Sequence, residues 1–226
     1  MTRTLQAAWT IARKDLRIEA RSRELVYTTL FFAVACLLVF AFAFVRERPI
    51  DNAAAGILWV ALAFSGTLAL GRTFERERQG ETLRALLLAP VERGAVYLGK
   101  LIALLLLMAA VELIVVPIVG LLFSAPLLRA PALLAGLLAL GTIGFAAIGT
   151  LFAAMLVRAS SRDVLLPILL YPMTAPLLIA GVQGTAAIFA DEPNLALAEN
   201  WLAMLLFFDA VVVTVALWVF GAVMTE

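Results

Sequence analysis

The 226-residue chain contains no histidine and only one cysteine. Histidine is the commonest metal ligand in proteins, the usual axial ligand of haem and the base of Ser-His-Asp and Cys-His sites. Its absence argues against metal-dependent or nucleophilic catalysis, so we expect a chain that is not an enzyme and binds no metal or cofactor directly. Methionine, tyrosine or Cys36 remain as alternative haem ligands. Cys36 has no partner within the chain, which excludes an internal disulfide.

Charged residues are also scarce. They make up 15% of the chain, against 64% hydrophobic residues and a mean hydropathy of +1.06, which is typical of polytopic membrane proteins. The formal net charge is +1 and there is no basic tail, so we expect the lipid bilayer and no nucleic acid as a partner. No repeat or linker divides the chain, which predicts a single domain over residues 1–226.

Six apolar stretches approach the roughly 20 residues with which a helix crosses ~30 Å of hydrocarbon. Backbone groups in lipid must be satisfied within the segment, and the alternating pattern of a membrane barrel is absent, so helices are the remaining solution. The sequence therefore predicts an all-α polytopic membrane protein with six transmembrane helices. They cover residues 25–45, 53–71, 101–123, 132–157, 164–184 and 201–224.

The distribution of lysine and arginine predicts the orientation. The N-terminal segment, the 72–100 connection and the 158–163 connection together hold 14 of the 17 basic residues, and Arg46, Arg48 and Arg129 are the other three. Basic connections stay on the cytoplasmic side. We therefore expect both termini and the 72–100 segment in the cytoplasm.

Residues 1–24 carry nine charges, three of them acidic, ahead of the first apolar stretch. A cleavable signal peptide has a short basic start and a small-residue cleavage site, so we expect this segment to be retained. Helical periodicity places one apolar face and one basic row on it, which favours an interfacial helix over a cytoplasmic arm. The face is Leu5, Trp9, Ala12 and Leu16, and the row is Arg13, Arg17 and Arg21.

The segment 72–100 is the most polar part of the chain, with ten charged side chains around an apolar patch. Gly80 and Pro90 bound two predicted helical turns at 81–88, and such a short amphipathic helix suits a groove in a partner protein. The alternative is a solvated connection. The residues that we expect to contact a partner are Arg72, Phe74, Glu77, Gly80, Glu81, Leu83, Leu86, Leu87 and Pro90.

Residues 94–101 match the phosphate-loop pattern except at the last position, where Leu101 stands in place of the Ser or Thr that binds magnesium. The context is also wrong, because this stretch opens a membrane span. We therefore expect no nucleotide site, and any ATP must be hydrolysed by a separate subunit.

Two carboxylates and a group of prolines interrupt the apolar stretches. Glu112, five residues before Pro117, is either a translocation or gating residue or a structural, hydrogen-bonded acid, because an ionised acid at mid-bilayer costs several kcal/mol. We expect Asp209 to lie nearer the outer end of its helix and to be structural. Pro167, Pro172 and Pro176 predict a kinked or broken fifth span, which is either a moving element or a purely structural kink.

Small residues recur every four positions in the fourth span, which predicts close helix packing within the subunit or between subunits. They are Thr142, Ala146, Thr150 and Ala154, with Gly149 and Ala153 alongside.

Several of these pieces together resemble the CcmB family, a membrane subunit of cytochrome c maturation, over most of the chain. They are Gly56-Ile57-Leu58-Trp59, Arg72, Phe74, Leu83, Leu86, Leu88, Pro90, Lys100, and the run from Pro172 through Pro176 to Ile179.

The resemblance implies the fold of type 2 ABC exporters (ABC-2), with an N-terminal elbow helix (1–24) and a coupling helix between the second and third spans. It also implies two copies of this subunit, a CcmA-like ATPase, the haem-handling proteins CcmC and CcmD, and release of the haem-loaded chaperone CcmE. The expected location is the bacterial inner membrane. Haem would be a transported or handled ligand, and the lack of histidine favours a mechanical role.

Two other functions stay open. One is a passive membrane scaffold for haem-handling partners. The other is an ABC-2 exporter of a different hydrophobic or lipid-linked substrate.

Overall fold

The computed structural model describes residues 2–44, 51–73, 93–157, 159 and 161–223, and the secondary structure of these residues is helical throughout. Phe74, Glu77, Gly80, Glu81, Leu83, Leu86, Leu87 and Pro90 lie outside them. The helices are α1 (Thr2–Ser22), α2 (Glu24–Ala43), α3 (Asp51–Thr73), α6 (Arg93–Phe123), α7 (Pro131–Met155), α8 (Arg162–Phe189) and α9 (Leu195–Val223).

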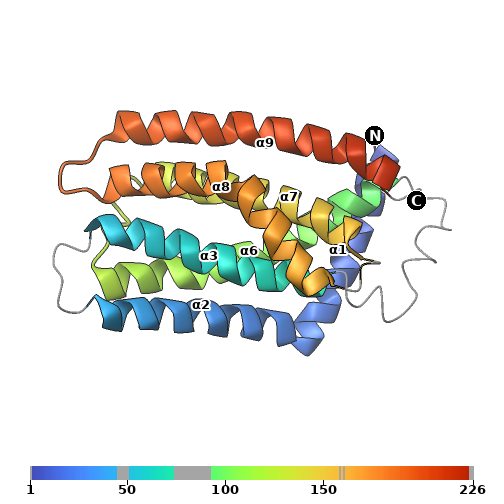
Figure 1. The fold of residues 1–226 in the computed structure, drawn as a ribbon, viewed down its shortest axis with the longest axis horizontal. Helices are drawn as coiled ribbons and strands as arrows, with labels where there is room; N and C mark the ends of the chain where they lie inside the picture. The colour runs from blue at the N-terminus through green and yellow to red at the C-terminus, as the bar shows by residue number, and fades with distance from the viewer. Residues whose placement is uncertain (1, 45–50, 74–92, 158, 160, 224–226) are drawn as a thin grey trace.

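Six long helices run along the molecule in alternating directions, and α1 lies across one end of them (Figure 1). All six are long and apolar enough to cross a membrane, which confirms the predicted all-α protein with six spans. The end of α3, the start of α6 and the end of α9 lie at the same end as α1. Helix α1, the end of α9 and both edges of the 74–92 connection therefore lie at one end of the bundle.

Several helices extend beyond the predicted apolar stretches. The third begins at Arg93 instead of 101, and the sixth at Leu195 instead of 201. At α9 the side chain of Asn194 accepts a hydrogen bond from the Leu197 amide at 3.0 Å, which caps the first turn. Hydrophobicity marks the part of a helix that lies in lipid, whereas capping and packing decide where the helix begins.

The core lies along α3 and α7. In their apolar windows 67% and 61% of the residues are buried, against 17% in both α2 and α9, which form two opposite edges of the bundle (Figure 1). The small residues of α7 make this packing possible: a Cβ atom at Gly149 would lie 2.2 Å from Leu70 of α3. Thr142, Ala146, Thr150, Ala153 and Ala154 are all buried, so this stripe packs within the subunit.

Helix α1 packs on α6 through small residues, a contact that the sequence did not predict. Ala8 and Ala12 are fully buried, and a Cβ atom at Gly99 of α6 would lie 2.8 Å from the Ala8 carbonyl oxygen. Leu5 and Trp9, which belong to the predicted apolar face, do not take part in this contact and are about half exposed, at 55% and 53%. The turn into α2 is made at Arg23, whose φ of 54° is left-handed and ends the first helix.

Helix α8 is continuous from Arg162 to Phe189 and contains Pro167, Pro172 and Pro176. It bends visibly along its length (Figure 1), so the fifth span is kinked and is neither broken nor re-entrant. Thr174 adds to this effect, because its hydroxyl donates to the Leu170 carbonyl one turn back at 2.9 Å.

Candidate functional site

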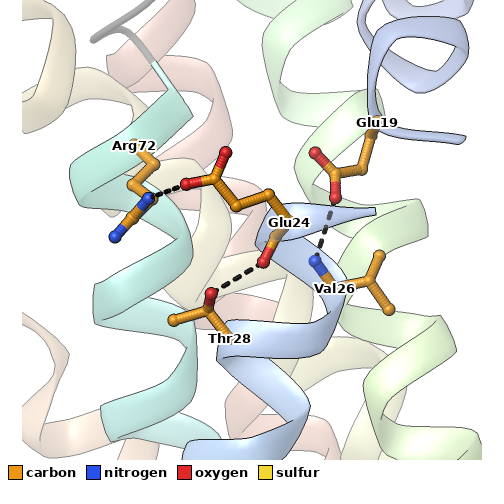
Figure 2. Close-up of polar contacts among 5 residues, drawn as sticks. All are labelled: Glu19, Glu24, Val26, Thr28 and Arg72. Carbon is orange, nitrogen blue, oxygen red and sulfur yellow. Dashed lines mark hydrogen bonds and ion pairs between the residues drawn. The ribbon is translucent and has the colours of Figure 1, made fainter. Parts of the chain in front are cut away.

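Polar contacts at the α1 end of the bundle hold the edges of the 74–92 connection. Arg72, in the last turn of α3, forms an ion pair of 2.6 Å with Glu24 at the start of α2 (Figure 2). Beside it, Glu19 of α1 accepts a hydrogen bond from the Val26 amide at 3.0 Å. The Arg72 pair is solvent-exposed, so it contributes at most about 1 kcal/mol to stability and serves mainly to position the two helix ends.

A second contact fixes the same end of α3. Arg162, at the start of α8, is 3% exposed and donates to the Leu70 carbonyl oxygen at 3.1 Å. Carbonyl groups in the last turn of a helix lack amide partners within the helix, and a guanidinium satisfies one of them. The sequence analysis placed Arg162 in a connection, because nothing in a local pattern reveals a partner 92 residues away.

Lys100 differs from its expected place in a polar connection. It lies within α6, its side chain is 2% exposed, and its ammonium forms an ion pair of 2.8 Å with Asp15 of α1. A buried lysine needs such a partner, because removing a charge from water without compensation is costly. The pair joins α1 to the helix that follows the 74–92 connection.

The near-match to a phosphate loop is part of the same helix. Residues 94–101 lie inside α6, where the amides beyond the first turn bond within the helix, and Gly99 packs directly against α1. A phosphate loop is an irregular turn whose free amides face the ligand, and the regular helix at residues 94–101 does not have this conformation. Among the described residues no group of three potential metal ligands comes together.

Glu112 lies in a groove of about 550 Å³ between α6 and α7. Its carboxylate accepts a hydrogen bond from Thr142 of α7. Apart from these two side chains the walls of the groove are apolar and include Leu105, Val116 and Pro117. Glu112 and Pro117 therefore line the same groove. The helix continues through Pro117. Such a volume falls within the range of about 300–1,000 Å³ that small-molecule sites occupy.

Asp209 lies at the middle of α9, not nearer one end as the sequence analysis expected, because α9 begins six residues earlier than the apolar stretch does. The side chain is 5% exposed, and neither carboxylate oxygen has a hydrogen-bond partner among the described residues. It occupies the space left by Gly144 of α7, where a Cβ atom would lie 2.3 Å from Oδ1. Burial of an unpartnered acid is expensive, so this residue is retained at a cost in stability.

The sequence did not predict that Trp59 packs between several helices. Its indole nitrogen donates to the Thr185 hydroxyl at 3.0 Å, and the ring lies against Gly141 and Gly181, where added Cβ atoms would approach to 2.1 and 2.5 Å. One side chain therefore joins α3, α7 and α8. The available signal was a tryptophan together with glycines in two other spans, but the sequence does not show which glycines it meets.

The comparisons with known proteins cover nearly the whole chain. The family model CcmB, described as CcmB protein, matches residues 6–225. A protein of Paracoccus denitrificans (strain Pd 1222) named Heme exporter protein B is 31% identical over 171 residues, which is 75% of this chain and 78% of that protein.

A protein of the same name from Escherichia coli (strain K12) is 33% identical over 96 residues. That match spans 42% of this chain and 44% of the relative, less than half of either. The Paracoccus match and the family model extend the similarity through the helices described above. The chain is a member of the CcmB family.

Proposed function

We propose that this chain is the membrane permease subunit of an ATP-driven complex in cytochrome c maturation. The observation that carries the proposal is the family match over residues 6–225, together with relatives named for haem export. The six spans support a transport subunit, and the helical conformation of residues 94–101 favours an ATPase on a separate chain. The whole chain would form one permease domain of the ABC-2 type in the bacterial inner membrane, with both termini in the cytoplasm.

We further propose that residues 72–100 receive the ATPase. The edges of this segment are held by contacts to four other helices: Arg72 to α2, Leu70 to α8, Gly99 and Lys100 to α1, and Tyr97, through its hydroxyl, to the Ala147 carbonyl of α7 at 3.0 Å. A displacement at the segment would therefore reach most of the bundle. In this proposal the partners are a CcmA-like ATPase, CcmC-like and CcmD-like proteins and the chaperone CcmE, with two copies of this chain in the complex.

The test is co-purification of the full chain with a CcmA-like ATPase. Leu86→Glu with Leu87→Glu should abolish retention of the ATPase and ATP-dependent release of the haem-loaded chaperone. The control is Leu128→Glu, which makes one such substitution at a side chain that is 88% exposed at the opposite end of the bundle and should leave both unchanged. Retention of the ATPase by the double variant would exclude docking at this segment.

The same preparation separates a permease from a passive scaffold. A permease should change the geometry of the bent helix α8 when the ATPase is trapped with ATP or with ADP, and a scaffold should not. An exporter of another hydrophobic substrate would bind the ATPase but fail to release the chaperone.

A further inference from the structure

Helix α1 separates its charges by sign. Its two acidic residues face the protein: Asp15 is paired with Lys100 at 2.8 Å, and Glu19 accepts a hydrogen bond from the Val26 amide. Arg13, Arg17 and Arg21 are exposed. The charged side chains that α1 exposes are therefore all basic, although the helix as a whole carries both signs.

An apolar stripe lies between the basic surface and the buried face. Leu5 and Trp9 are 55% and 53% exposed, and Leu16 is half-buried. At about 100° per residue, Trp9 and Leu16 lie within about 20° of each other around the helix, and Arg13 is only about 40° beyond Trp9. Apolar and tryptophan side chains flanked by arginines are the pattern of a helix that lies at a lipid surface.

The position of α1 in the fold agrees with this pattern. It lies across the end of the six spans, so its apolar stripe can face the edge of the hydrocarbon while the spans cross it (Figure 1). Three arginines at a spacing of four repel one another weakly unless anions lie beside them. The arrangement is stabilised by negative charge at the depth of the lipid headgroups.

We propose that α1 is a binding site for anionic phospholipid, with the arginine row Arg13, Arg17 and Arg21 holding the headgroup phosphates and the stripe of Leu5, Trp9 and Leu16 lying against the acyl chains. The site is separate from the proposed ATPase contact. The proposal does not depend on which substrate the chain transports. Because Asp15 joins α1 to Lys100, a bound lipid would also steady the start of α6.

The test uses the full chain in detergent, titrated with phosphatidylglycerol or phosphatidylcholine and analysed by native mass spectrometry. A basic residue near an anionic surface contributes about a five-fold gain in affinity, so Arg13→Gln with Arg17→Gln and Arg21→Gln should weaken phosphatidylglycerol binding roughly 100-fold. Binding of phosphatidylcholine should stay unchanged. Added salt should weaken phosphatidylglycerol binding to the original chain far more than to the triple variant.

Two controls separate the arginine row from charge in general. Replacing the same three arginines by lysine should retain most of the affinity. Lys14→Gln removes a charge from the same helix, but this ammonium lies 3.0 Å from Asp15, so its loss should matter less than Arg17→Gln alone. If the triple variant does not fold, Arg17→Gln alone tests whether the arginine row binds phosphatidylglycerol.

Three outcomes would overturn the proposal. They are equal affinity for the two lipids, unchanged binding by both the triple variant and Arg17→Gln, and full competition by soluble glycerophosphoglycerol, which would indicate a site for free phosphate esters instead of a lipid.

Discussion

Individual side chains in this protein hold helices that are distant in sequence, and Trp59 does so most extensively. Its ring fills the space beside Gly141 and Gly181, and its nitrogen reaches Thr185. Protein interiors are packed as densely as organic crystals, so the surrounding helices cannot yield without cost.

We predict that Gly141→Ala destabilises the protein, because the new Cβ would lie 2.1 Å from the Trp59 ring. Overpacking costs about 1–3 kcal/mol, which corresponds to a fall of roughly 2–4 °C in Tm for each kcal/mol. Thermal unfolding in detergent, followed by the loss of the monodisperse peak, measures the effect.

The control is Gly56→Ala on α3, where a Cβ atom meets nothing within 4 Å. Alanine is the better helix former, so this variant should unfold at the same temperature as the original chain or slightly above it. Equal Tm values for the two variants would mean that Trp59 does not pack tightly against Gly141 of α7.

The contacts of Lys100 and Glu112 also could not be predicted from the residue pattern around them. Lys100 was expected in a polar connection and is instead a buried partner of Asp15. For Glu112 the structure supplies a hydrogen-bond partner, Thr142, and a groove beside it, so the structural and the translocation interpretations both remain predictions.

At the scale of one element, α8 combines three prolines with a continuous helix. Each proline lacks the amide that would bond one turn back, and its ring clashes with the carbonyl of that turn. The helix bends because a bend relieves this clash. The sequence correctly predicted a disturbed helix, and the bend of a single 28-residue helix is what the structure adds.

We predict that Pro172→Ala with Pro176→Ala straightens α8. Spin labels at Val164→Cys and Ile179→Cys, both at exposed positions, should move apart toward the roughly 23 Å rise of 15 residues in a straight helix. Pulsed electron paramagnetic resonance in a Cys36→Ala background measures the distance.

Pro126→Ala, in the turn between α6 and α7, is the matched control and should leave the α8 distance unchanged. If the double variant keeps the original distance, packing against the neighbouring helices sets the bend, and the prolines only tolerate it.

At the scale of the whole molecule, the six alternating spans place α1, the edges of the 74–92 connection and the end of α9 together. Residues 1–24, 72–100 and 158–163 together hold 14 of the 17 basic residues, and the described helix ends that border these segments lie at this end. The positive-inside rule therefore predicts that this end of the bundle faces the cytoplasm.

We predict that Gln6→Cys on α1 reacts with a membrane-impermeant maleimide only in inverted inner-membrane vesicles. Leu128→Cys, at the opposite end, should react only in intact spheroplasts. Both are made in the Cys36→Ala background, so that each protein carries one thiol.

Detergent-solubilised samples, in which both positions should react, control for accessibility. Labelling of Gln6→Cys in intact spheroplasts would reverse the orientation and exclude a cytoplasmic ATPase at residues 72–100.

The sequence alone determined the helical class, the six spans and the family resemblance, because hydrophobic length, backbone satisfaction in lipid and basic-residue bias are local properties that add along the chain. Only the tertiary structure decided that Lys100 pairs with Asp15, that Arg162 caps α3, that Asp209 is buried against Gly144 with no hydrogen-bond partner among the described residues, and that Trp59 fits between two glycines. These contacts join residues from 65 to 126 positions apart, and a local sequence pattern does not show which distant residues it will contact in the fold.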